Sequence, residues 1–174
     1  MRVRPMDILV FSDSHGRGAR MEEAYRRQPT PPDAVFFLGD GLRDFAGVSF
    51  DDTDVYAVRG NCDFASFSAE EPEERLVRLG GFCFCLMHGH RYGVKNGVAA
   101  AAEHAARAGA DALLFGHTHE PLEETLPAGA RVGSFVLPKP LLLFNPGSIG
   151  EGYSASFGVL VLRSGNILPG HGAI

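Results

Sequence analysis

The chain has 174 residues, of which 45% are hydrophobic and 21% are charged, and its formal net charge is −5. These values suit one globular domain, residues 1–174, and argue against a dedicated nucleic-acid binder, which would carry a basic surface. No apolar stretch approaches the roughly 20 residues of a membrane span, and the run after Arg4 is too short for a signal peptide. We therefore expect a soluble cytoplasmic protein. A metal-dependent enzyme acting on phosphates stays possible, because bound cations supply local positive charge.

The first part of the chain alternates predicted strands with a helix. Apolar runs at 6–11, 34–38 and 54–58 are typical of short strands. Between the first two, residues 19–28 carry apolar side chains on one helical face, and Pro29 ends the helix. This alternation predicts an α/β arrangement.

A hairpin signal follows. Two β-type runs, 75–79 and 82–87, flank a pair of glycines that can form the turn. Cys83 and Cys85 alternate with phenylalanines in the second run, which indicates buried thiols on one face of a strand rather than a redox pair. The odd number of cysteines favours a reducing compartment.

The last part of the chain combines one helix with several short strands. The alanine-rich stretch 95–108 predicts a helix capped by Asn96 and ended by Gly109. Residues 127–140 are loop-like at both ends and predict a hairpin that projects from the body. Further strands are expected at 112–115, 122–126, 134–137, 141–144, 157–162 and 167–168. Strands that alternate with a helix in the first part of the chain, followed by hairpins in the last part, predict an α/β sandwich with a pair of mixed sheets.

Five of the apolar runs stop at a polar residue that can bind a metal. The stops are Asp13-Ser14-His15, Gly39-Asp40, Gly60-Asn61-Cys62-Asp63, His88-Gly89-His90 and Gly116-His117-Thr118-His119. A buried strand that delivers such a residue at its carboxyl end, five times in one small chain, indicates a metal site on the rim of a sheet.

The residue types at these stops form a plausible ligand set. Asp13 and His15 are two apart, so in an extended segment their side chains lie on the same side. Asp40 adds a carboxylate that can bridge two cations, and Asn61 adds a neutral oxygen. Imidazole nitrogens come from His88, His117 and His119. Oxygen and nitrogen donors without thiolate suit Mn²⁺, Fe²⁺, Zn²⁺ or Ni²⁺ better than Mg²⁺ or Ca²⁺.

Each motif taken alone has an ordinary alternative. Asp-x-His and Gly-Asp occur in turns with solvated side chains, and an Asn after glycine commonly fills a left-handed position. Their joint occurrence, in order and each at a strand end, favours the metal site, and four of the seven histidines fall at these positions.

The ordered motifs closely resemble those of the calcineurin-like metallophosphoesterases. Gly60-Asn61-Cys62-Asp63 and the later Asn145-Pro146-Gly147-Ser148 are similar to the small bacterial and archaeal phosphodiesterase branch, which also contains the retromer sorting subunit of eukaryotes. The resemblance extends from Asp7 to about Leu162. It implies a four-layer αββα sandwich with a dinuclear metal site, and a phosphodiesterase in which a metal-bridging hydroxide attacks small phosphodiesters in line.

The resemblance also implies a role for each candidate ligand. The first metal ion is expected on Asp13, His15 and His119. The second is expected on Asn61, His88 and His117. Asp40 would bridge the two ions, and Asp40, Asn61 and His88 would serve in catalysis. Mn²⁺ is the expected metal, with Ni²⁺, Fe²⁺, Co²⁺ and Zn²⁺ as alternatives.

One residue departs from the family pattern. Many relatives have His where this chain has Cys62, and that His is thought to protonate the leaving group. A thiol with a pKa near 8.5 suits this task poorly, so Asp63 or His90 would have to replace it, or the substrates would need good leaving groups. The simpler interpretation of Cys62 is a small residue that fills space beside Asn61.

The candidate substrate contacts are Arg17, Cys62, Asp63 and His90, although Arg17 also fits a solvated surface residue. The expected partner is a small phosphoester, with a homo-oligomer left open. A rival hypothesis is a scaffold that has lost catalysis, but a decayed site should lack ligands and all seven are present. A nuclease would want a basic groove, which the charge does not favour.

Overall fold

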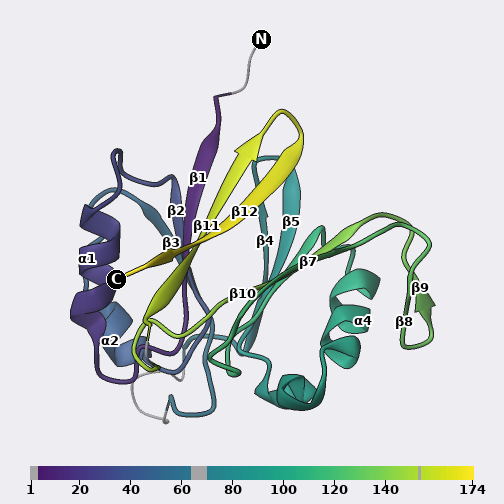
Figure 1. The fold of residues 1–174 in the computed structure, drawn as a ribbon, viewed down its shortest axis with the longest axis horizontal. Coiled ribbons are helices and arrows are strands. Elements are labelled where there is room, and N and C mark those ends of the chain that lie inside the picture. The colour runs from purple at the N-terminus through teal and green to yellow at the C-terminus, as the bar shows by residue number, and fades with distance from the viewer. Residues whose placement is uncertain (1–3, 64–69, 153) are drawn as a thin grey trace.

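The computed structural model describes residues 4–63, 70–152 and 154–174, and it contains two five-stranded mixed sheets (Figure 1). The first sheet has the order β12-β11-β1-β2-β3. Its strands are β1 (Met6–Phe11), β2 (Ala34–Phe37), β3 (Asp54–Ala57), β11 (Ser156–Arg163) and β12 (Asn166–Ala173). β1, β2 and β3 run parallel, while β11 is antiparallel to both of its neighbours.

The second sheet has the order β4-β5-β6-β10-β7. Its strands are β4 (Glu74–Leu79), β5 (Phe82–Met87), β6 (Ala112–Leu114), β7 (Pro121–Leu126) and β10 (Leu141–Pro146). The three central strands are parallel, and the edge strands β4 and β7 are antiparallel to them. The predicted hairpin is therefore confirmed as β4 and β5.

Helices cover the outer face of each sheet, on opposite sides of the molecule (Figure 1). The first sheet packs against α1 (Gly18–Arg26) and α2 (Leu42–Ala46). The second packs against α4 (Ala99–Arg107) and the short ribbon of β8 (Arg131–Val132) and β9 (Phe135–Val136). The expected αββα sandwich is confirmed. Among the described residues, no helix is long and apolar enough to cross a membrane.

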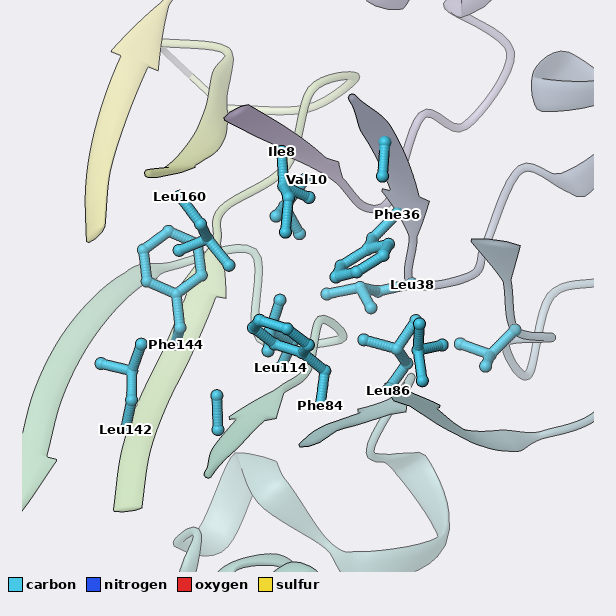
Figure 2. Packing of buried hydrophobic residues seen from close by; sticks show 14 of the residues in the cluster. Ile8, Val10, Phe36, Leu38, Phe84, Leu86, Leu114, Leu142, Phe144 and Leu160 are labelled. Atoms are coloured by element: carbon cyan, nitrogen blue, oxygen red, sulfur yellow. The ribbon is translucent and has the colours of Figure 1, made fainter. Parts of the chain in front are cut away.

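The main core lies between the two sheets, as Figure 2 shows. Alternation along β1 sends Ile8 and Val10 into this core, while Leu9 and Phe11 face the helices of the first sheet. Phe36 from the first sheet meets Phe84 from the second, with ring centroids 5.5 Å apart. A central strand that is covered on both faces explains the uninterrupted apolar run at 8–11.

The helix predicted at 95–108 begins later than expected. α4 starts at Ala99, because Gly97 has φ of +133°, which no α-helix permits. The preceding 3₁₀ turn η2 (Val94–Asn96) makes Asn96 part of that turn, so its predicted capping role was wrong. The short helix α2 and the turn η1 (His90–Tyr92) were not predicted at all.

One of two further β predictions needs correction. β12 has eight residues instead of the expected 167–168. It is an edge strand that pairs with β11, so Pro169, Gly170 and Gly172 are tolerated there. The hairpin predicted within 127–140 is confirmed as β8 and β9. It packs on α4, where Val132 is buried and the Arg107 guanidinium lies 4.8 Å from the centroid of the Phe135 ring.

Candidate metal centre

The predicted ligands are gathered where the two sheets meet at the carboxyl ends of their parallel strands. The loops after β1 and β2 are joined by a bond from the Asp13 N–H to the Gly39 carbonyl, 2.9 Å. The loops after β5 and β6 are joined by a bond from the Gly116 N–H to the His88 carbonyl, 3.1 Å. The His117 N–H then donates to Asp13 Oδ2, 3.1 Å, and this bond links the two sheets.

Among the described His, Cys, Asp and Glu side chains, three compact groups could hold a metal ion, and two of them consist wholly of predicted ligands. In the first group, Asp13, His15 and His119 each offer an atom within 4.8 Å of the other two, and His119 Nε2 lies 3.1 Å from Asp13 Oδ1. In the second group, Asp40, His88 and His117 meet the same distance criterion. These groups match the two ligand sets that the sequence resemblance implied, apart from Asn61.

Asp40 lies between the two groups. Its Oδ2 is 3.2 Å from His88 Nε2 in the second group and 3.9 Å from His15 Nε2 in the first. Its Oδ1 accepts a 2.7 Å bond from the Cys62 N–H, which fixes the carboxylate against the loop after β3. Asn61, the seventh candidate, belongs to that loop and is exposed, with its Nδ2 3.5 Å from Cys62 Sγ.

The backbone is strained at these positions. Among the described residues other than glycine, seven have positive φ, a conformation that costs free energy for L-residues. Five of the seven are candidate ligands, namely Asp13, His15, Asp40, His117 and His119. Strain that persists at five converging side chains indicates that the surrounding structure holds them for a purpose beyond packing.

Close approach of the loops requires glycine. A Cβ at Gly60 would lie 2.1 Å from Asp40 Oδ1 and 2.6 Å from the Asp40 backbone nitrogen. A Cβ at Gly116 would lie 1.9 Å from Ser12 Oγ and 2.8 Å from Asp13 Oδ2. These short distances explain why the sequence motifs have glycine immediately before Asn61 and before His117.

Hydrogen bonds orient the imidazole rings. The His88 Nδ1–H donates to the Leu38 carbonyl at 2.7 Å, which leaves Nε2, 3.2 Å from Asp40 Oδ2, as the nitrogen that a metal would use. His119 has its Nδ1 3.1 Å from Glu151, a carboxylate that sequence reasoning missed. Such partners fix the tautomer of a metal-binding histidine.

The donor atoms fit cations at both positions. His15 Nε2 and His119 Nε2 are 3.4 Å apart, and His117 Nδ1 and His88 Nε2 are 3.2 Å apart, so nitrogen lone pairs converge beside buried carboxylates. His88 and Asp13 are fully buried, while the side chains of His15 and His119 are 22% and 31% exposed. The site therefore has a buried base and partly exposed histidines above it.

The pKa shifts of the two carboxyls and of His117 suit metal binding. Burial opposes ionisation of Asp13 and Asp40, but bonds and charges from His119 and His88 outweigh it and lower the pKa of both carboxyls. Burial and the neighbouring His88 lower the pKa of His117 to about 4, so this imidazole is neutral at physiological pH. Burial alone would lower the pKa of His88, yet its contacts with Asp40 and Asp13 raise it.

Asp63, a predicted substrate contact, holds the backbone of the site together. Its Oδ2 accepts bonds from the N–H groups of Asp40 and Gly60, both at 2.8 Å. Its Oδ1 accepts bonds from Gly41 and Leu42, both at 2.9 Å. One carboxylate thus ties the loop after β3 to the loop after β2.

The other predicted substrate contacts lie around the rim. Arg17 is exposed at the N-cap of α1. Cys62 is exposed beside Asp40, and its Sγ lies 3.5 Å from Asn61 Nδ2. His90 packs against His88 with ring centroids 5.5 Å apart, and its Nε2 lies 3.8 Å from Glu73.

Residues outside the five motifs complete the loops. Asn145 Nδ2 donates to the Gly116 carbonyl, and Ser148 Oγ donates to the Asp13 carbonyl, so the Asn-Pro-Gly-Ser segment supports both sheets' loops. Asp44 Oδ2 accepts bonds from Ser14 Oγ and the Gly16 N–H. Asp44 was not predicted, because a lone acidic residue in a short helix carries no sequence signal.

The substitution Asp63→Asn should destabilise the protein by about 1.5–3 kcal/mol, because an amide cannot accept all four N–H groups that now bond to a charged acceptor. Urea denaturation of the metal-free protein measures this. Asp52→Asn, at an exposed turn position, is the matched control and should shift stability by less than about 0.5 kcal/mol. Equal stability of the two variants would contradict the role assigned to Asp63.

Comparison with known proteins agrees with this arrangement. The sequence model of the calcineurin-like phosphoesterase superfamily domain matches residues 6–165. The chain is also 31% identical over 144 residues to the probable metallophosphoesterase YsnB of Bacillus subtilis (strain 168), covering 83% of this chain and 75% of that protein. The chain belongs to the calcineurin-like phosphoesterase superfamily.

Two solved structures share the fold. One is described as a novel archaeal phosphodiesterase, with a TM-score of 0.69, 21% identity and coverage of 97% of this chain and 100% of that one. The other is vacuolar protein sorting 29 from Cryptosporidium parvum, with a TM-score of 0.71, 19% identity and coverage of 98% of both chains. At these identities the likeness concerns the fold alone.

Proposed function

We propose that this protein is a phosphodiesterase of one domain, residues 1–174, which hydrolyses small phosphodiesters at a dinuclear metal site. The observation that carries the proposal is the pair of ligand groups that share Asp40 between them. The first ion would be held by Asp13, His15 and His119. The second would be held by Asn61, His88 and His117. The family supports divalent metal, and we propose Mn²⁺, with the borderline metals as alternatives.

Two divalent cations at such a site supply a nucleophile from water at neutral pH and polarise the phosphoryl oxygens. The chain's own residues set the charge of the site. Asp13 and Asp40 are ionised and His117 is neutral, so the ligands offset only part of the positive charge of two ions. The surplus attracts an anionic phosphoester even though the protein as a whole is acidic.

The surroundings favour esters with good leaving groups. Both carboxylate oxygens of Asp63 accept backbone bonds, so this residue is poorly placed to donate a proton. The Nε2 of His90 lies 3.8 Å from Glu73 Oε1, so this nitrogen already faces a carboxylate. Neither residue is therefore well placed to protonate a leaving group, and an ester whose leaving group needs no protonation does not require such an acid.

The scaffold hypothesis is kept as the alternative, because a vacuolar sorting protein has the same fold. Retention of all seven candidate ligands in the sequence, five of them with strained backbone, favours the enzyme. A small-molecule substrate fits the acidic chain better than nucleic acid does. Self-association is compatible with either hypothesis.

The purified protein should hydrolyse bis(p-nitrophenyl) phosphate, and chelation should abolish the activity. Metal-stripped protein is assayed with Mn²⁺, Ni²⁺, Co²⁺, Fe²⁺ and Zn²⁺ added back one at a time, alongside a metal-only blank. At least one ion should restore turnover and bind at two equivalents per chain. If none does so, the enzyme proposal fails and the scaffold is favoured.

A further inference from the structure

One thiol lies among the ligand atoms of the metal centre. Cys62 Sγ, Asp40 and His15 each offer an atom within 4.8 Å of the other two. The other two cysteines, Cys83 and Cys85, are buried in β5, at 2% and 0% exposure. Cys62 is thus the accessible thiol of the chain, and it faces two side chains that already belong to the proposed site.

The backbone holds Cys62 in this position. Its N–H donates to Asp40 Oδ1 at 2.7 Å, so the residue cannot move away from the carboxylate without losing that bond. The next residue, Asp63, bonds the N–H groups of Gly60 and Asp40, which fixes the loop on the far side of Cys62. Rigid presentation of a donor beside two other donors is typical of a ligand and is not required for a space-filling residue.

We propose that Cys62 is a thiolate ligand of the metal ion held by Asp13, His15 and His119. The inference rests on the metal centre of the proposed function and adds a donor to it. On binding, the S–H bond breaks, the proton passes to solvent, and the sulfur electron pair binds the cation.

A sulfur donor would make the two metal positions unequal. The first position would carry oxygen, nitrogen and thiolate donors, which favour Zn²⁺, Co²⁺ or Fe²⁺. The second, with Asp40, Asn61 and two imidazoles, has no thiolate and would accept Mn²⁺. The expected product of mixed metal loading is therefore a centre that contains two different ions.

Cobalt substitution tests the assignment without relying on turnover. Metal-stripped wild-type protein and Cys62→Ser are loaded with Co²⁺ in a thiol-free reductant, and bound cobalt is counted by elemental analysis. The wild type should show a near-ultraviolet thiolate-to-cobalt charge-transfer band that Cys62→Ser lacks. Cys83 and Cys85 remain in both proteins and serve as internal controls. Competition titrations should show a loss of Zn²⁺ affinity of about 10–100-fold in the variant, with Mn²⁺ affinity within about threefold.

The possible failures are distinguishable. Two cobalt ions per chain with no band in the wild type would overturn the thiolate ligand and leave the metal centre intact. A band of equal strength in both proteins would assign it to Cys83 or Cys85 and also overturn the proposal. Failure of both proteins to bind cobalt would overturn the metal centre itself. Circular dichroism confirms that the variant is folded, which is expected because Cys62 is exposed.

Discussion

Replacing Asp40 with asparagine should lower turnover of bis(p-nitrophenyl) phosphate by at least about 10²-fold, the size typical of losing one group that stabilises charge in the transition state. The carboxylate reaches His88 at 3.2 Å and His15 at 3.9 Å, so it is the donor placed to serve both ions. An amide offers one oxygen and no charge. Bound metal should therefore fall from two ions per chain to one or none.

Asp52→Asn is the control for this substitution, because Asp52 is exposed in a turn before β3. It should retain full turnover and both ions. Thermal unfolding with and without metal separates loss of metal binding from loss of the fold. Added metal raises the unfolding temperature only of a variant that still binds it. Two bound ions with normal turnover in Asp40→Asn would refute the bridging assignment.

The substitution Gly60→Ala should damage the site almost as severely without removing a ligand. The added methyl would lie 2.6 Å from the Asp40 backbone nitrogen, and backbone cannot swing aside as a side chain can. We expect a destabilisation of about 1–3 kcal/mol from overpacking. We also expect a loss of turnover of about 10²-fold, because a shift near 1 Å in a positioned group has that effect.

Gly47→Ala provides the matched comparison. At Gly47 the nearest atom to an added Cβ is the Asp44 carbonyl oxygen at 3.4 Å, and its φ of −86° is allowed for alanine. This variant should keep its turnover and change stability by less than about 0.5 kcal/mol. If Gly60→Ala behaved in the same way, the close approach of the two loops would not be a requirement of the site.

The strands that carry the ligands were predictable because their apolar runs are short and end at recognisable stops. β1, β2 and the β4–β5 hairpin lie where the sequence indicated them. β12 was mostly missed, since Pro169 and its glycines oppose a strand unless it lies at an edge, and edge position is a property of the whole sheet. The start of α4 was missed because the sequence does not reveal that Gly97 takes a positive φ.

By itself the sequence determined the family resemblance and the identity of the seven candidate ligands, because these depend on residue types at the ends of apolar runs. Only the tertiary structure decided which residues support them. Asp63 binds four backbone N–H groups across two loops, and Glu151 meets His119 from a distant loop. Such contacts join residues far apart in the chain, and their partners are backbone atoms or lone carboxylates that leave no pattern. The place of Cys62 beside His15 and Asp40 was decided in the same way, by the packing of three loops onto one another.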